Sequence, residues 1–362
     1  MWPNEVSLAI VFGAALVASL VLSPLAGLLG TRVGFVDKPR PGEMQQRPTP
    51  RSGGYAIIAA FWVAVALSLL LLPHAAEEQQ RLLGMLLGSA LVLPIAIIDD
   101  AWRLSPRPQL IGQIVVSLVP IAFGVTISNV ANPFGGIALL PLWIALPFTL
   151  FWLVGMINTL NFIDTMDGMA GGVSAIAVLI LFARAFTLQQ YTIAALMLGL
   201  LGACLGFLPY NLPRAKLFMG TSGSMFLGYS LAVMALVGGA KIATTLMVLS
   251  IPILDTALVI ATRLLHGRSP FKGGDAAHFP HRLLAFGFSQ RQILVASYAL
   301  CLVLGYLALS LSAVQKLLAL GAMGIVLAAT IGLIAYRARL ALRASNRASA
   351  QLDGENQKHE VG

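Results

Sequence analysis

The stretch that decides the fold is NTLNFIDTMDGMAGG, residues 158–172, which follows an apolar run that begins near Leu139. Amides and carboxylates recur in it every three residues, at Asn158, Asn161, Asp164 and Asp167. Residues three apart are neighbours on a helix, but such a row drifts around the axis by about 60° per step, so a straight helix cannot aim all four at one point. We therefore predict a break in the helix here, which the glycines that follow allow.

Charged residues at the end of a membrane-type segment require a physical reason. In lipid an ionised side chain is strongly disfavoured unless it faces water, a partner or a metal, so such carboxylates indicate a functional site. The alternative is a polar helix end at a membrane surface, which a single Asp would suggest. Four polar residues at fixed spacing, followed by three glycines, favour the functional interpretation.

Composition places the whole chain in a membrane. Its 362 residues are 58% hydrophobic and only 10% charged, and the mean hydropathy is +0.86, whereas soluble proteins are about a quarter charged. Cys204 and Cys301 lie in apolar runs without metal-ligand spacing. The net charge of +9 favours membrane orientation, anionic lipid or a phosphorylated ligand over nucleic acid, because the sequence contains no aromatic–basic nucleic-acid module.

The hydropathy pattern predicts an all-α integral membrane protein of about 11 transmembrane helices, forming a single domain over residues 1–340. The expected segments are about 1–30, 54–73, 82–98, 110–127, 138–157, 172–187, 191–208, 224–240, 242–262, 293–312 and 317–336. Most of the 23 Lys and Arg residues fall in alternate connections, which predicts an outside N-terminus and a cytoplasmic C-terminus. The polar tail 344–362 is predicted to be disordered.

Asp99 and Asp100 end the third of these segments. Two adjacent carboxylates repel each other, and at a membrane rim they stay ionised only with a shared cation or ample water. A divalent metal, Arg103 or Arg107 would supply that charge. Exposed acid pairs are common at helix ends, but this pair falls on the same predicted face as the Asn/Asp row.

The segment 211–228, NLPRAKLFMGTSGSMFLG, puts a glycine- and serine-rich turn before an apolar helix. Backbone N–H groups at such a helix start suit an anion, so a phosphate site is one interpretation and a simple turn is the other. Phe218 would stack on a base or anchor at the membrane interface, and the sequence favours the anchor.

The loop from Arg263 to Arg291 carries His278, His281 and Arg282, which together offer hydrogen-bond donors to phosphate oxygens. A zinc site is less favoured, because Pro280 separates the two histidines and no cysteine is near. Asp255 precedes this loop. It is either a partner in the site or a polar link between helices, and both interpretations stay open.

With these motifs in view, the chain resembles the polyprenyl-phosphate N-acetylhexosamine-1-phosphate transferases (glycosyltransferase family 4), and the undecaprenyl-phosphate GlcNAc-1-phosphate branch more than the muramoyl-pentapeptide branch. The resemblance covers nearly the whole chain to about residue 340. Five ordered segments carry it: VDKPRPGEMQQRPTPRSGG (36–54), IDDAWRLSPRPQLIGQ (98–113), NTLNFIDTMDGMAGG, NLPRAKLFMGTSGS and GRSPFKGGDAAHFPHRL (267–283). It implies a bundle of ten or eleven helices with a site at the cytoplasmic face of the bacterial inner membrane.

The resemblance also implies partners and roles. The substrates would be a UDP-N-acetylhexosamine and undecaprenyl phosphate within membrane lipid, the product would start a cell-envelope glycan such as O-antigen, and the cofactor would be Mg²⁺, with Mn²⁺ also compatible. A homodimer is compatible as well. Catalytic roles would fall to Asp99, Asp100, Asp164 and Asp167; substrate binding to Asn158, Asn161, Asn211, Phe218, Ser222, His278, His281 and Arg282; and metal binding to Asn161, Asp164 and the position of Thr221.

Three positions depart from the family pattern. Thr221 stands where G-D-x-G-S has its Asp, Thr165 replaces a glycine of D-G-M-D-G, and Gln45 or Gln46 stands where a His is common. A neutral hydroxyl is a weaker ligand than a carboxylate for a hard cation. Either other carboxylates hold the metal, or the chain is an impaired member that binds nucleotide sugar or lipid phosphate. A transporter would instead place polar residues at mid-depth.

Overall fold

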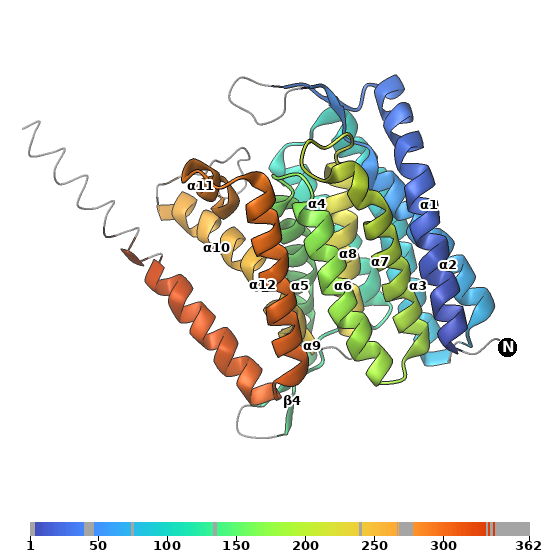
Figure 1. The fold of residues 1–362 in the computed structure, drawn as a ribbon. Coiled ribbons are helices and arrows are strands. Elements are labelled where there is room, and N and C mark those ends of the chain that lie inside the picture. The colour runs from blue at the N-terminus through green and yellow to red at the C-terminus, as the bar shows by residue number, and fades with distance from the viewer. Residues whose placement is uncertain are drawn as a thin grey trace, which may run out of the picture.

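The computed structural model describes residues 4–39, 47–73, 76–132, 136–238, 241–265 and 278–330, with a few single positions beyond these ranges. The described chain is almost entirely helical (Figure 1). Its elements in order are α1 Asn4–Val33, β1 Val36–Asp37, β2 Thr49–Pro50, α2 Gly53–Leu71, α3 Ala76–Trp102, α4 Pro106–Ala122, β3 Asn129–Ala131, β4 Ile137–Leu139, α5 Leu142–Ile163, α6 Met169–Thr187, α7 Tyr191–Asn211, α8 Gly220–Val237, α9 Lys241–Val248, α10 Ser250–Leu265, α11 Phe279–Ala285 and α12 Gln290–Ser310. A last helix covers Ala313–Thr330.

Nine of the described helices are long and apolar enough to cross a membrane, and the bent pair α9–α10 makes a tenth candidate. The helix α4, with 17 residues, is slightly shorter than these spans. Together they account for the eleven segments expected from hydropathy. The prediction of a polytopic all-α membrane protein is confirmed, while the tail 344–362 and the residues Gln45 and Gln46 lie outside the described part of the chain.

The segment 242–262 was expected to form one membrane-spanning helix, and the structure instead divides it into two helices. The chain bends by 79° between α9 and α10, so that α10 runs across the direction of its neighbours (Figure 1). Pro252 stands near the start of α10, where a missing N–H is tolerated, whereas in the interior of one continuous helix it would break a hydrogen bond. The bend directs α10 towards α11.

The centre of the bundle is formed by α7 and α8. In the most apolar 18-residue stretch of each helix, 78% of the residues are buried in α7 and 83% in α8. In the last helix, Ala313–Thr330, none of these residues is buried. The helices α1, α2 and α6 pack on α7, and α2, α3 and α5 pack on α8. Small residues allow close approach: a Cβ added at Gly206 of α7 would lie 2.5 Å from the carbonyl oxygen of Leu16 in α1.

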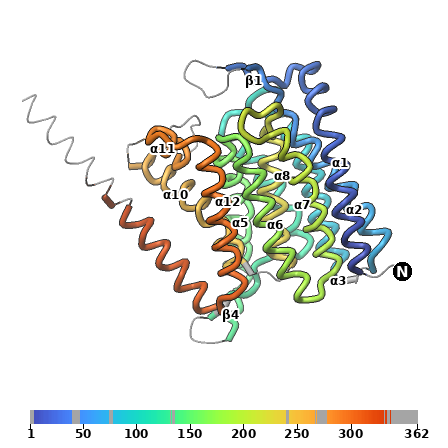
Figure 2. The backbone as a smooth tube through the Cα atoms, viewed as in Figure 1, coloured from blue at the N-terminus to red at the C-terminus, as the bar shows by residue number. Residues whose placement is uncertain are grey.

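The connections that carry the sequence motifs gather at one end of the bundle. The β1–β2 hairpin and α11 lie at the top of Figure 2, opposite β4 and the N-terminus. Phe218 of the α7–α8 loop pairs with this hairpin, because its N–H donates to Pro50 (2.8 Å) and its carbonyl accepts from Gly53 (2.9 Å). Gly54 must be glycine, since an added Cβ would lie 2.1 Å from the nitrogen of Gly223.

Candidate active site

The structure contains the predicted helix break, which lies within the row of Asn158, Asn161, Asp164 and Asp167. The helix α5 ends at Ile163, and α6 begins at Met169 after Gly168, whose φ of +78° favours glycine. The turn is held from two other helices. The Gly168 N–H donates to Oδ1 of Asn211 at 3.0 Å, and the Tyr298 hydroxyl of α12 donates to the Gly168 carbonyl.

Asn211 at the end of α7 ties this turn to the α7–α8 loop. Its side chain is buried, and Nδ2 donates to the Leu217 carbonyl at 3.0 Å while Oδ1 accepts from Gly168. One amide therefore satisfies backbone groups of two loops, which stabilises the relative positions of both. The substrate contact implied for Asn211 stays a prediction beside this visible structural role.

Asp167 is fixed by the same loop. Its Oδ2 accepts the backbone N–H groups of Arg214 at 3.1 Å and Ala215 at 3.0 Å. Burial raises the pKa of Asp167, whereas these two N–H groups and the side chain of Gln290 act to lower it. Asp167 is thus a carboxylate whose negative charge is partly offset by protein donors.

Asp164 contrasts with Asp167, because it accepts no hydrogen bond from any described residue. Desolvation raises its pKa well above the usual range, and the charges of Asp167 and Asp100 raise the pKa further. Asp100 at the end of α3 and Asp167 in the same turn therefore lie close enough to Asp164 for their charges to act on it. Asn161, one turn earlier on α5, accepts from the Ser224 hydroxyl of α8 at 3.0 Å.

The carboxylate of Asp100 is held by residues of α2 and α8. Its Oδ2 accepts from the Tyr55 hydroxyl at 2.9 Å, and its Oδ1 accepts from the Thr221 N–H at 3.3 Å. The Arg51 guanidinium donates to the Asp100 backbone carbonyl. The position usually occupied by Asp in the motif, here Thr221, therefore lies beside Asp100.

Asp99, although adjacent in sequence, is used differently. Its Oδ1 accepts the Leu104 N–H at 3.1 Å and stabilises the turn after α3. Arg103, one of the cations considered for the acid pair, instead forms an ion pair with Asp37 of β1 at 2.9 Å. Asp99 and Asp100 therefore have separate protein partners.

The donor set fits a divalent cation completed by substrate. Among the described residues, no three His, Cys, Asp or Glu side chains form a closed metal site. Mg²⁺ does not need one, since it is commonly held by one or two carboxylates together with waters and phosphate oxygens. Asp164 has no donor among the described residues and faces two like charges, so a cation would relieve its electrostatic repulsion.

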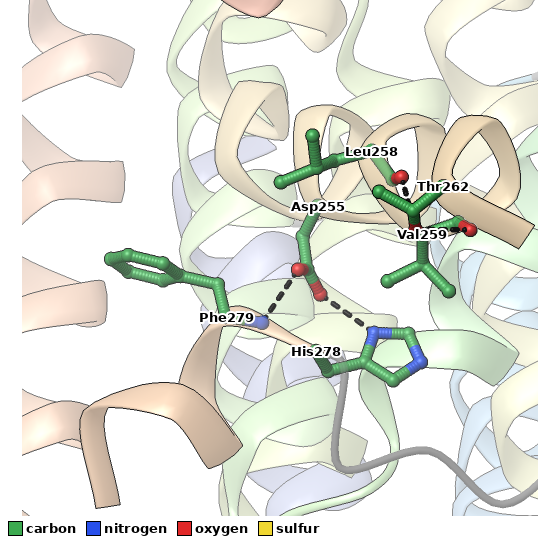
Figure 3. Close-up of polar contacts among 6 residues, drawn as sticks. All are labelled: Asp255, Leu258, Val259, Thr262, His278 and Phe279. Carbon is green, nitrogen blue, oxygen red and sulfur yellow. Dashed lines mark hydrogen bonds and ion pairs between the residues drawn. The ribbon is translucent and has the colours of Figure 1, made fainter. Parts of the chain in front are cut away.

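His278 approaches the same end of the bundle. Its Nδ1 lies 2.8 Å from Oδ2 of Asp255 on α10, and its ring lies 6.3 Å from that of Phe162 on α5 (Figure 3 shows the Asp255 contact). Asp255 is therefore the partner of His278 and links α10 to the start of α11. Burial lowers the pKa of His281, His278 lowers it further, and Asp255 opposes them. Arg282 is half-buried on α11, while residues 268–277 lie outside the described chain.

Two predicted site residues have contacts away from the carboxylates. Asn158 donates to Oε1 of Gln113 on α4 at 2.6 Å, which forms an amide link between two helices. Phe218 is half-buried, and its main chain joins the hairpin described above. The ligand contacts implied for both residues stay predictions.

Tyr55 and Gln113 are two polar residues of this region that were not among the predicted site residues. Gln113 is a buried amide in the apolar part of α4, and such intramembrane polar residues are a recognised signal for a partner. Tyr55 directly follows the 36–54 segment. Its partner is 45 positions away, and no local pattern in the sequence indicates that pairing.

The fold and site define a class: a polytopic helical membrane protein with carboxylates converging at one end of its bundle. The family model described as glycosyl transferase family 4 matches residues 82–239.

Named relatives agree with that match. The chain is 30% identical to the probable undecaprenyl-phosphate N-acetylglucosaminyl 1-phosphate transferase of Bacillus subtilis, over 81% of this chain and 82% of the relative. It is 32% identical to the decaprenyl-phosphate N-acetylglucosaminephosphotransferase of Mycobacterium tuberculosis (79% and 77%). It is 27% identical to the undecaprenyl-phosphate alpha-N-acetylglucosaminyl 1-phosphate transferase of Escherichia coli K12 (73% and 73%). The chain therefore belongs to glycosyl transferase family 4, and the resemblance seen in its motifs is confirmed.

Proposed function

We propose that this protein transfers N-acetylhexosamine 1-phosphate, specifically GlcNAc 1-phosphate, from its UDP-sugar to undecaprenyl phosphate and releases UMP. The observation that carries the proposal is the position of Asp164, on which the charges of both Asp100 and Asp167 act, at the end of the bundle where the polar connections meet. The names of the three relatives support a polyprenyl-phosphate acceptor and a GlcNAc-1-phosphate donor.

In the proposed reaction, a phosphate oxygen of the lipid attacks the β-phosphorus of the UDP-sugar. The bond from that phosphorus to the oxygen shared with the α-phosphate breaks, and UMP leaves with that oxygen. Such transfers depend mainly on positioning and on neutralising charge. Bound Mg²⁺, or Mn²⁺, would supply positive charge to the diphosphate, held by Asn161, Asp164 and the position of Thr221.

The remaining residues would position the two substrates. Asp99 and Asp100 would orient the lipid phosphate and accept any proton it carries, whereas His278, His281 and Arg282 would bind the diphosphate. Asp167, Asn211 and Phe218 would lie on the uridine side. The site would form part of a single domain over residues 1–340.

We further propose that the site faces the cytoplasm from the bacterial inner membrane. The Lys and Arg distribution supports this orientation, and a site at the end of the helices would let a water-soluble donor meet a lipid acceptor. A homodimer stays a prediction of the family resemblance.

The decisive experiment combines purified protein in nanodiscs with undecaprenyl phosphate, Mg²⁺ and a panel of UDP-sugars. We expect a lipid diphosphate with the mass of one added N-acetylhexosamine, equimolar UMP, and preference for UDP-GlcNAc. Chelation with EDTA should stop product formation, and restored Mg²⁺ should recover it. Absence of lipid product with every UDP-sugar, in both Mg²⁺ and Mn²⁺, would contradict the proposal.

Thr221 supports a second candidate, an impaired family member that binds nucleotide sugar or lipid phosphate. Its N–H contacts Asp100, so an Asp at this position would add a carboxylate beside the site. Thr221→Asp distinguishes the two: a rate increase of several orders of magnitude would support impairment, and an unchanged rate would show that the site is complete with Thr. Thr221→Asn is the matched neutral control.

A further inference from the structure

Asp255 and His278 form a buried pair that joins α10 to the start of α11. Their side chains are only 5% and 4% exposed. Asp255 uses both oxygens, since Oδ2 contacts Nδ1 of His278 at 2.8 Å and Oδ1 accepts the Phe279 N–H at 2.7 Å (Figure 3). The same carboxylate thus orients the ring and stabilises the first turn of α11.

This contact determines which nitrogen of His278 carries hydrogen. An ionised carboxylate only accepts hydrogen bonds, so Nδ1 must be the donor to Asp255. The other nitrogen, Nε2, lies on the side of the ring away from Asp255, so the carboxylate leaves it available to another group.

The surroundings of the ring place this atom near the carboxylate site. Phe162, whose ring lies 6.3 Å from that of His278, is two residues before Asp164. On α11, His281 is the neighbouring titratable group, and the field of His278 lowers its pKa. The pair therefore borders the end of α5, where the phosphates of the donor are proposed to bind.

We propose that Asp255 is a positioning residue: it accepts the Nδ1–H of His278 and directs Nε2 towards the UDP-sugar, where the doubly protonated ring donates from Nε2 to a phosphate oxygen. This inference rests on the proposed function. An imidazolium between a carboxylate and a phosphate is stabilised by the negative charge on each side. Both of its N–H groups then have acceptors, which a neutral partner at position 255 would not allow.

Asp255→Asn tests this role with little change in shape. The Asn oxygen still accepts from Phe279, but its amide N–H₂ faces Nδ1 and requires that nitrogen to be an acceptor. Asp255→Asn, His278→Gln and the double variant would be compared with the wild type. Glu78→Gln, at the opposite end of α3, is the matched carboxylate-to-amide control.

Two readouts separate positioning from folding. In protein labelled with ¹⁵N-histidine, with His278 assigned by its loss in His278→Gln, we expect a protonated Nδ1 in the wild type and a hydrogen moved to Nε2 in Asp255→Asn. The KM for UDP-GlcNAc should rise about 10- to 100-fold, as when the carboxylate partner of a ligand-binding histidine is lost. The change in kcat should be smaller, and the thermal midpoint should stay near that of Glu78→Gln.

The double variant shows whether the effect passes through His278. If it does, Asp255→Asn causes no further rise in KM when His278 is already replaced by Gln. An Nε2–H tautomer in the wild type, an unchanged KM in Asp255→Asn, or full additivity in the double variant would overturn the inference.

Failure of the proposed function would look different. The wild type would then give no lipid product, while the ¹⁵N spectra would still report the tautomer. The dissociation constant for UDP-GlcNAc, measured by following the His278 resonance, would replace KM, and the same three outcomes would decide the inference.

Discussion

Two carboxylates at the same end of the bundle have opposite surroundings. Asp255, at the α10–α11 junction, accepts from Phe279 and pairs with His278, so both its oxygens are occupied. Asp164, in the α5–α6 turn, accepts no hydrogen bond from the described residues and faces the charges of Asp100 and Asp167.

Asp255 therefore stabilises the contact between two protein segments, whereas Asp164 is left to interact with a ligand. A buried charge is tolerated when donors compensate it, and removal of one partner leaves the other uncompensated. A carboxylate without donors, beside like charges, destabilises the empty fold and gains its partner only when a cation or substrate binds. Asp100, with donors from Tyr55 and Thr221, lies between these two cases.

The largest expected effect is on the unpaired carboxylate. Asp164→Asn should lower the transfer rate by about 10³-fold, because a charge that offsets the reacting phosphates is lost. The thermal midpoint without divalent cations should stay equal or rise, since a like-charge repulsion is removed. Glu78→Gln is the control. A strongly destabilised Asp164→Asn protein would contradict the view that Asp164, unlike Asp255, does not stabilise the fold.

The same variant should lose its response to metal. Mg²⁺ at 100 times its dissociation constant should stabilise the wild type by about 2.7 kcal/mol, and Asp164→Asn should gain much less. Thermal midpoints measured across a Mg²⁺ titration check this without any turnover. Equal stabilisation of both proteins would show that Asp164 does not contribute to cation binding.

The next effect concerns the paired carboxylate. Asp255→Ala removes both acceptors and should reduce the free energy of unfolding by about 3–5 kcal/mol, the range for breaking a buried charge pair. Asp164→Ala should change it far less. Denaturation of the two variants in matched detergent gives the comparison directly, and equal losses would refute the distinction between the two carboxylates.

A smaller effect is expected at the intermediate carboxylate. Tyr55→Phe removes one donor to Asp100 and should reduce kcat/KM about tenfold, since a hydrogen bond to a charged group contributes roughly 1.5 kcal/mol or more. Tyr210→Phe is the control, because that hydroxyl donates to the Leu20 carbonyl at 2.9 Å instead. If Tyr210→Phe lowered kcat/KM as much as Tyr55→Phe, the effect could not be assigned to the hydrogen bond with Asp100.

The smallest effect is expected at the amide pair between α4 and α5. Asn158→Leu should destabilise the protein by about 0.6–2 kcal/mol, the usual range for interhelical hydrogen bonds in membranes. Asn158→Leu with Gln113→Leu should recover much of that loss, because no buried amide is then left unpaired. Loss of activity without loss of stability would instead support the substrate contact implied for Asn158.

Much of the architecture was predictable because its causes are local. The apolar composition required a helix bundle in lipid, and the three-residue spacing from Asn158 to Asp167 required a break that Gly168 provides. The motif segments also led to the family. These features depend on hydropathy and on the geometry of a few consecutive residues, which are encoded within short stretches of the chain.

The pairings inside the site were decided only by tertiary structure. Hydropathy did not reveal the bend between α9 and α10, and it gave no reason to pair Tyr55 with Asp100 or Asp255 with His278. In a membrane bundle, lipid-facing and protein-facing sides are both apolar, so the sequence pattern does not specify which faces meet. The sequence therefore determined the bundle and its reactive end, whereas the packing of distant helices determined which carboxylates have partners and which one remains for a ligand.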